Sequence, residues 1–207
     1  MLLVLRDVNP HCVLAFTQLF GGEDDVSFGS GDLTQAQVDA VVSPANSFGI
    51  MDGGIDRYYR NTFGLRVENT LRGLIERRYP EGELPIGEAL LVPTGHPRIP
   101  RMVAAPTMRT PGRIVGTDNV RRAMLAALRT ASAAANPPIE RLGCPSMGTG
   151  VGRMDPFDAV EQMLDAWRSF RAERAGTVKS SQSLSSLAVA DDATPSLPHV
   201  RDSDDQS

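Results

Sequence analysis

An amide and a carboxylate stand ten residues apart in the first third of the chain, at Asn46 and Asp56, with Gly53 and Gly54 shortly before the carboxylate. An amide both donates and accepts hydrogen bonds, so Asn46 could bind the hydroxyl groups of a sugar. Asp56 falls in the first turn of a predicted helix, where the helix dipole favours a carboxylate in any case. Two interpretations of Asp56 therefore stay open, helix stabilisation and chemistry on a bound ligand.

Two glycine-rich loops occupy the same kind of position, after a predicted strand and before a predicted helix. The first spans residues 49–54 and the second residues 148–152. Glycine lets backbone N–H groups come close to a ligand, and the following helix adds the positive end of its dipole. Neither loop is a Walker A or GxGxxG motif. Both could be simple tight turns, or they could hold two phosphates on one edge of a sheet.

A third polar side chain, Asp32, follows another apolar strand in the segment GSGDLT. Aspartate is common in loops, where it caps helices and forms turns. Its alternative role is to accept hydrogen bonds from an exocyclic amine such as that of adenine. The residues alone leave both interpretations open.

Strands and helices alternate along the chain. The sequence predicts strands at 1–8, 26–33, 38–44, 88–95, 102–108 and 141–146, and helices at 10–20, 55–63, 66–78, 118–135 and 155–170. This alternation predicts an α/β fold whose central sheet, parallel or mixed, carries helices on both faces. Ligands of such sheets bind at the carboxyl ends of the strands, where the loops gather.

The composition limits the classes of protein. Apolar residues make up 41% of the chain, enough for a core, while the net charge of −4 argues against a dedicated binder of duplex DNA. Cys12 and Cys144 have no CxxC spacing, and no signal peptide or membrane-spanning run is visible, which predicts a cytoplasmic setting. Residues 176–207 hold eight serines, five aspartates and no aromatic residue, which predicts a disordered tail after one domain at residues 1–175.

Five segments in the same order resemble the macrodomain family, an ADP-ribose-binding fold with three α/β/α layers around a mixed sheet. GDLT at 31–34 is similar to the family's GD-[IVL]-T, SPAN at 43–46 to its N-A-A-N, and GGID at 53–56 to its glycine run and aspartate. LPIGEA at 84–89 resembles a strand entry of the family, and SMGTGVG at 146–152 its second phosphate loop. The resemblance covers roughly residues 25–170, and the interval from Asn46 to Asp56 equals the family spacing.

The resemblance implies that the chain binds ADP-ribose, with Asp32 at the adenine amine and Asn46 at the hydroxyls of the distal ribose. In the hydrolytic branch of the family, Asn46 and Asp56 would be the catalytic pair. Asp56 would orient or partly deprotonate a water that attacks the anomeric carbon, releasing an ADP-ribosyl group from a protein carboxylate. The other residues that the resemblance assigns to substrate binding flank these groups or form the two phosphate loops: Leu33, Ala45, Gly53, Gly54, Ile55, Ser146, Gly148, Thr149, Gly150, Val151 and Gly152.

Other functions stay open on the same site. One is a reader that binds ADP-ribose without turnover, and another is the processing of ADP-ribose 1″-phosphate or O-acetyl-ADP-ribose. A related branch of hydrolases depends on a lysine near the distal ribose. The only lysine here is Lys179, in the predicted tail, so the sequence argues against that lysine-dependent mechanism. The expected partner is ADP-ribose or an ADP-ribosylated protein, with no cofactor, metal, membrane or specific nucleic acid. The identity of that protein and the oligomeric state are not predicted.

The chain departs from the family pattern at three places. Ser and Pro at 43–44 replace Asn and Ala, and Met and Asp at 51–52 replace two glycines, which puts a negative charge near the expected phosphate site. Arg153 follows the second loop where many relatives carry an aromatic residue that packs on the distal ribose. Arg153 could contact a phosphate or face water, and Phe48 and Phe157 could replace the aromatic or pack in the core.

Overall fold

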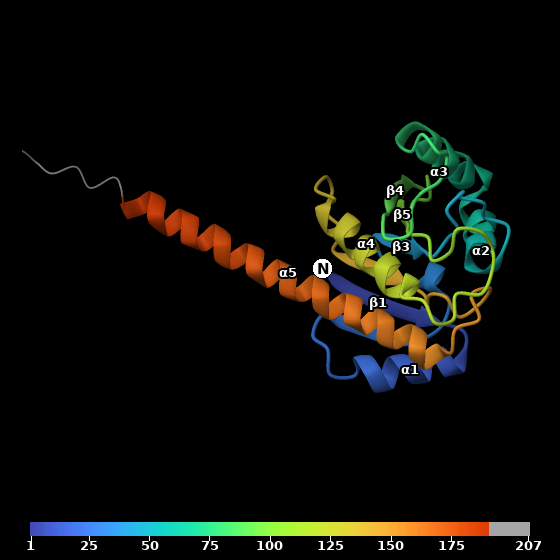
Figure 1. Ribbon diagram of the computed structural model, residues 1–207, viewed down its shortest axis with the longest axis horizontal. Coiled ribbons are helices and arrows are strands. Elements are labelled where there is room, and N and C mark those ends of the chain that lie inside the picture. The colour runs from blue at the N-terminus through green and yellow to red at the C-terminus, as the bar shows by residue number, and fades with distance from the viewer. Residues whose placement is uncertain (191–207) are drawn as a thin grey trace, which may run out of the picture. The chain divides into compact units, whose positions relative to one another are not determined.

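Six strands form one mixed sheet in the order β2-β1-β6-β3-β5-β4 (Figure 1). The computed structural model describes residues 1–190, and side chains for residues 1–177. The strands are β1 (Leu2–Asp7), β2 (Val26–Ser30), β3 (Ala40–Ser43), β4 (Leu90–Pro93), β5 (Arg101–Ala104) and β6 (Arg141–Cys144). The helices are α1 (Pro10–Phe20), α2 (Gly54–Phe63), α3 (Leu65–Arg78), α4 (Asn119–Ala133) and α5 (Pro156–Ala190), with a short 3-10 helix, η1 (Leu33–Gln35). Neighbouring strands are parallel except β4 and β5.

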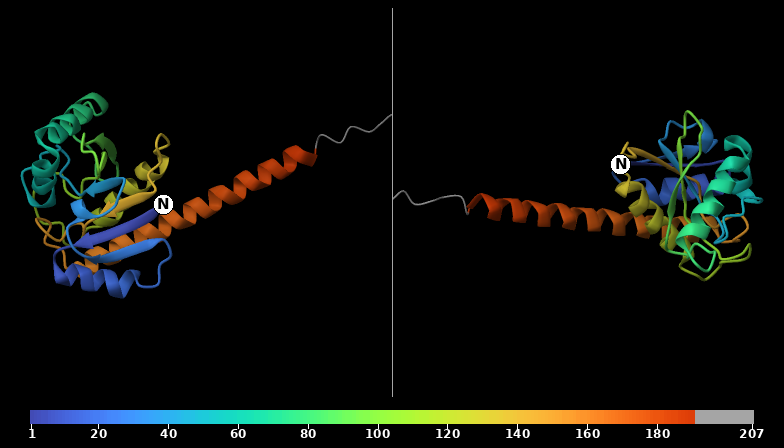
Figure 2. Two further views of the ribbon diagram at one scale, coloured as in Figure 1. Left: turned by 180° about the vertical axis from the view of Figure 1, so that it is seen from behind. Right: turned by 90° about the horizontal axis from the view of Figure 1, so that it is seen from above.

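The sheet separates two hydrophobic cores. Leu3 and Leu5 of β1 belong to the core shared with α1, α4 and α5, whereas Val4 between them belongs to the core shared with α2 and α3. This division follows from the strand geometry, because successive side chains point to opposite faces. Helices therefore cover both faces of the sheet (Figure 2), and the prediction of a three-layer α/β/α fold with a mixed central sheet is confirmed.

Three adjacent parallel strands end at the same edge of the sheet. β1 pairs with β6 in the register Leu5↔Cys144, and β6 pairs with β3 in the register Leu142↔Ala40. The turn after β1, the loop after β3 and the loop after β6 consequently leave the sheet side by side. The two glycine-rich loops are the second and third of these connections.

A glycine in β6 lets η1 approach the sheet. A Cβ atom at Gly143 would lie only 2.9 Å from Leu33 Cδ1 and 3.2 Å from Val38 Cγ1, so a larger residue there would push η1 outward. Leu33, 3% exposed, instead packs against the strand. This contact holds Asp32, the N-cap of η1, at the same edge of the sheet as the loops.

The predicted helices and strands occur in the predicted order, and apart from the far end of α5 their ends differ by a few residues, whereas the sequence does not predict η1. The side chain of Asn9 caps α1 as expected, accepting from the backbone N–H of His11 at 3.0 Å.

Residues Met1–Phe170 form one compact unit. α5 continues to Ala190, so residues 176–190 are helical where the sequence predicts a disordered tail, and residues 191–207 lie outside the described residues. The division of the chain after residue 175 stays a prediction. Within residues 1–190, no helix is both long and apolar enough to cross a bilayer.

Candidate functional site

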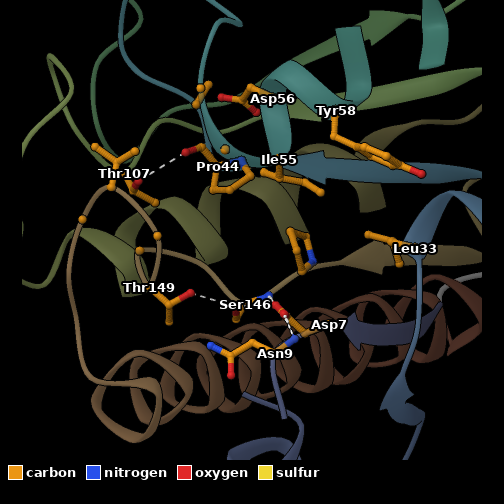
Figure 3. Close-up of a pocket in the computed structure, with 18 of the residues that line it drawn as sticks. Asp7, Asn9, Leu33, Pro44, Ile55, Asp56, Tyr58, Thr107, Ser146 and Thr149 are labelled. Carbon is orange, nitrogen blue, oxygen red and sulfur yellow. Dashed lines mark hydrogen bonds between the residues drawn. The ribbon is translucent and has the colours of Figure 1, made fainter. Parts of the chain in front are cut away.

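A cavity of about 630 Å³ opens at the carboxyl edge of the sheet (Figure 3). Its size is that of a typical small-molecule site. Every residue that the sequence assigns to the site lines it: Asp32, Leu33, Ala45, Asn46, Gly53, Gly54, Ile55, Asp56, Ser146, Gly148, Thr149, Gly150, Val151 and Gly152. The two glycine-rich loops thus border one cavity. The binding and catalytic roles of these residues remain predictions.

The side chain of Asn46 stabilises the first loop through hydrogen bonds to the backbone of that loop. Its Nδ2 donates to the carbonyl oxygen of Ile50 at 2.7 Å, while its Oδ1 accepts from the N–H groups of Phe48 and Ile50 at 3.1 and 3.3 Å. Asn46 is 7% exposed, so these bonds anchor the loop to a buried point. The sequence suggests a contact with a sugar, and the structure adds a role in the loop that residue spacing does not reveal.

The first loop also depends on α3. A Cβ atom at Gly49, whose φ is +66°, would lie 2.9 Å from Leu71 Cγ, so both the conformation and the space favour glycine. The carboxylate of Glu68 accepts from the N–H of Met51 at 3.1 Å, and the Met51 side chain is fully buried. Met51 and Asp52 are the two residues that replace glycines of the family pattern. Of these, Asp52 lines the cavity and is exposed, whereas Met51 does not line it.

The glycines of the second loop serve two different purposes. Gly148 has φ +77°, and a Cβ atom there would meet Val120 Cγ2 at 2.7 Å. A Cβ atom at Gly152 would collide with the carbonyl oxygen of Gly148. Gly150 differs, since an added Cβ would meet nothing within 4 Å, and Gly53 of the first loop is equally open. The fold therefore requires Gly148 and Gly152, whereas Gly150 and Gly53 border open space that a ligand can occupy.

Asp7 ties the end of β1 to the start of the second loop (Figure 3). Its Oδ2 accepts from the N–H of Ser146 at 3.1 Å and from the Ser146 hydroxyl at 2.5 Å, while Oδ1 accepts from the N–H of Asn9 at 2.8 Å. The hydroxyls of Ser146 and Thr149 lie 2.9 Å apart. Sequence analysis missed Asp7, although an acid at the end of the apolar run MLLVLRD is a signal that could have indicated it.

Asp56 is a buried carboxyl group inside the cavity, 7% exposed. Burial raises its pKa to about 7; a hydrogen bond from Ser43 opposes the rise, and the charge of Asp52 adds to it. The Ser43 hydroxyl donates to Asp56 Oδ1 at 2.6 Å. The serine that stands where the family carries asparagine therefore supplies a donor to the carboxyl group. A group with this pKa can exchange a proton near neutral pH.

Asp32 is fixed by hydrogen bonds. Its Oδ1 accepts from the N–H and the hydroxyl of Thr34, both at 2.8 Å, and its Oδ2 accepts from the Tyr58 hydroxyl at 2.6 Å. Burial alone would raise the pKa of Asp32, but the hydrogen bonds from Tyr58, Thr34 and the Gln35 side chain together outweigh burial and lower it. Sequence analysis missed Tyr58. Its spacing of three residues from Ile55 on a helix is the signal that could have revealed it.

The charged residues that line the cavity are mostly acidic: Asp7, Asp32, Asp52 and Asp56 against Arg6. The Arg6 guanidinium donates to the carbonyl oxygen of Leu5 at 2.8 Å and to Ser27 at 3.3 Å. A phosphorylated ligand would accordingly be held by backbone N–H groups of the loops rather than by a cluster of cations. Among the residues that the structure describes, no three His, Cys, Asp or Glu side chains are placed to share a metal ion.

Phe48 and Phe157, which could replace the aromatic residue that many relatives carry after the second loop, do not line this cavity. The Arg109 guanidinium lies 5.3 Å from the ring centroid of Phe48, and Phe157 packs against the core. Arg153 is exposed, with φ +56°. The aromatic residue in the cavity lining is Tyr58, which comes from α2.

The layers of the fold, with two glycine-rich loops and a buried carboxyl group lining one cavity, define an α/β protein with a candidate ligand site at the carboxyl edge of its sheet. Residues 42–163 match the Macro domain family, and the chain belongs to this family. The matched span begins within β3, so Asp7 and Asp32 precede it.

Known proteins agree with this assignment. An uncharacterised protein of Aquifex aeolicus is 31% identical over 146 residues, which are 70% of this chain and 82% of that protein. The DNA ADP-ribosyl glycohydrolase of Mycobacterium tuberculosis is 24% identical over 147 residues, 69% of this chain and 39% of that protein. A solved mutant of the Oceanobacillus iheyensis macrodomain with ADPR has the same fold, with a TM-score of 0.59, 18% identity and coverage of 68% of this chain and 74% of that one.

Proposed function

We propose that this chain binds ADP-ribose and hydrolyses mono-ADP-ribosyl groups from modified protein carboxylates. The observation that carries the proposal is the Asp56 carboxyl group, which has a pKa of about 7 and lies in the cavity bordered by both glycine loops. A general base is most effective when its pKa lies near the working pH, because it is then both ionised and able to take a proton.

The ligand position follows from the donors around the cavity. The diphosphate lies between the N–H groups at the start of α2, Gly53 to Ile55, and those of residues 148–151. The dipole of α2 favours this position, and the open space at Gly53 and Gly150 admits the phosphate oxygens. The distal ribose then lies beside Asp56, and the adenine lies beside Asp32.

In the hydrolytic step, a water molecule held between Asp56 and the diphosphate attacks the anomeric carbon of the distal ribose. A bond forms from the water oxygen to that carbon as the bond from the carbon to the acceptor carboxylate breaks. The departing carboxylate keeps the electron pair, and Asp56 takes a proton from the water. The products are ADP-ribose and a free protein carboxylate. Positioning and nearby N–H donors supply much of the rate enhancement.

Asn46 acts on the ribose through the hydrogen that its loop does not use. One Nδ2 hydrogen binds the carbonyl oxygen of Ile50, and an amide nitrogen carries two. The second hydrogen is available to a hydroxyl of the distal ribose. Asn46 thereby combines a contact with the sugar and a brace for the loop that precedes Gly53.

The test measures release of labelled ADP-ribose from an ADP-ribosyltransferase that has modified its own carboxylates. Three proteins are compared: wild type, Asp56→Asn, and the matched control Asp118→Asn, whose side chain is exposed, makes no cap hydrogen bond and lies outside the cavity. We expect release by the wild type and the control. We expect none from Asp56→Asn, although that variant binds ADP-ribose within about tenfold of the wild type. Release by Asp56→Asn at the wild-type rate would refute the catalytic role, and a wild type that binds ADP-ribose without release would be a reader.

A DNA acceptor is the second candidate, favoured by the likeness to the DNA ADP-ribosyl glycohydrolase of Mycobacterium tuberculosis. The net charge of −4 and the acidic cavity lining favour the protein acceptor. Parallel reactions with ADP-ribosylated DNA and with carboxylate-modified protein separate the two. Faster release from DNA would reassign the acceptor while leaving the role of Asp56 intact.

A further inference from the structure

Tyr58 is unusual among the residues of the cavity because it is exposed and yet held in place. Its side chain belongs to α2 and is 44% exposed, and its hydroxyl donates to Asp32 Oδ2, on the connection between β2 and η1, at 2.6 Å. Hydrogen bonds to an ionised acceptor are about twice as strong as neutral ones. The bond therefore restrains a ring that would otherwise sample several rotamers in water.

The position of Tyr58 places this ring along the path of the ligand. Ile55 and Tyr58 are three residues apart on α2, so they share a face of the helix, and both line the cavity. Figure 3 shows Tyr58 and Leu33 together at one end of the cavity, with Thr149 at the other. A nucleotide that runs from the loop at Gly53 to Asp32 consequently passes the ring of Tyr58.

The carboxylate of Asp32 is the acceptor group at this end of the cavity. A carboxylate offers about four lone-pair sites. Two donors from Thr34 occupy Oδ1, the Tyr58 hydroxyl binds Oδ2, and the Gln35 side chain also hydrogen-bonds the carboxylate. A donor on a ligand would approach Oδ2 beside the Tyr58 hydroxyl. An ionised carboxylate accepts and does not donate. The end of the cavity therefore suits a flat group that carries an N–H donor on its edge.

We propose that Tyr58 determines the base specificity of this site: its ring is the surface on which an aminopurine stacks, and its hydroxyl orients Asp32 toward the amino group of that base. The inference rests on the proposed binding of ADP-ribose. Tyr58 and Asp32 act as one unit, because loss of the hydroxyl frees the carboxylate to rotate and loss of the ring removes the stacking surface.

The test is calorimetric titration with two ligands, ADP-ribose and inosine diphosphate ribose, in which a carbonyl replaces the amino group of the base. The proteins are wild type, Tyr58→Ala, Tyr58→Phe and the control Tyr79→Phe. Tyr79 donates to Glu88 at 2.7 Å, a tyrosine–carboxylate bond like that of Tyr58, and neither residue lines the cavity. Thermal melts accompany each titration to verify folding.

We expect the wild type to bind ADP-ribose at least about tenfold more tightly than the inosine analogue, as for a hydrogen bond to a charged group. Tyr58→Ala weakens ADP-ribose binding about tenfold through lost stacking. Tyr58→Phe keeps the stacking but reduces the preference for the amino base at least about threefold. Tyr79→Phe changes neither quantity. Unchanged affinity and preference in both Tyr58 variants overturn this inference alone, whereas a wild type that fails to bind ADP-ribose overturns the proposed function as well.

Discussion

Replacement of Asp56 by asparagine should stabilise the protein at neutral and alkaline pH while it abolishes hydrolysis. The pKa of Asp56 is raised from 3.8 to about 7, mainly because the group is buried. The native state therefore keeps a proton that the unfolded chain loses above its own pKa. The contribution of Asp56 to stability is fully present below pH 3.8 and is lost as the pH rises to about 7.

The size of the effect follows from the two pKa values. Each unit of difference between the native and unfolded pKa values corresponds to about 1.4 kcal/mol. The free energy of unfolding therefore falls by on the order of 4 kcal/mol between pH 3.8 and about 7. Asparagine is neutral at every pH and can still accept the hydrogen bond from Ser43, so the variant does not suffer this loss. Its free energy of unfolding, relative to the wild type, should rise by that amount across the same interval.

Urea denaturation from about pH 4 to pH 8 measures this difference, because subtraction of the two proteins cancels the titration of all other groups. Asp118→Asn is the control, and its difference from the wild type should be flat, since the Asp118 side chain is exposed. A flat difference for Asp56→Asn as well would mean that Asp56 is ionised at low cost in the native state. Its assignment as a base that titrates near pH 7 would then be wrong.

Two further predictions concern the carboxyl group and the loops. Ser43→Ala removes the donor that lowers the pKa of Asp56 and moves the rising limb of the pH–rate profile to higher pH, whereas Asp52→Asn removes a like charge and moves it to lower pH; profiles that do not shift in opposite directions would contradict this assignment. Gly150→Ala should keep the melting temperature within about 2 °C yet weaken ADP-ribose binding about tenfold, because its Cβ meets only open space in the cavity. Gly152→Ala should lower the melting temperature by about 4 °C or more, because its Cβ collides with a carbonyl oxygen of the same loop; equal melting temperatures would refute this distinction between the two glycines.

Local patterns were sufficient for the order of elements, and the resemblance to the macrodomain family supplied most of the site residues that line the cavity. Asn9 and Pro10 mark the start of α1, and the apolar run before Asn46 marks a buried strand. Asn46, Gly53 and Asp56 lie within eleven residues of one another in the sequence, so the motif that they form can be recognised without the structure. Because the loops come after parallel strands, their meeting at one edge of the sheet was also predictable.

Contacts between distant segments were not predictable in this way. The insertion of β1 between β2 and β6 brings Asp7 to Ser146, 139 residues away, and no local signal encodes that strand order. The bond between Tyr58 and Asp32 spans 26 residues and depends on the packing of α2 near η1. Such pairings depend on which elements become neighbours, and this is decided by the packing of the whole core.

The amino-acid sequence by itself determined where strands, helices and glycine turns occur and which carboxylate stands ten residues after Asn46, because propensity and periodicity act over a few neighbouring residues. Only the tertiary structure decided the state of that carboxylate. Asp56 owes its pKa to burial, to a donor thirteen residues away and to a nearby charge. Those quantities depend on how much water the folded chain excludes from the group, and solvent exclusion is a property of the assembled layers rather than of any segment.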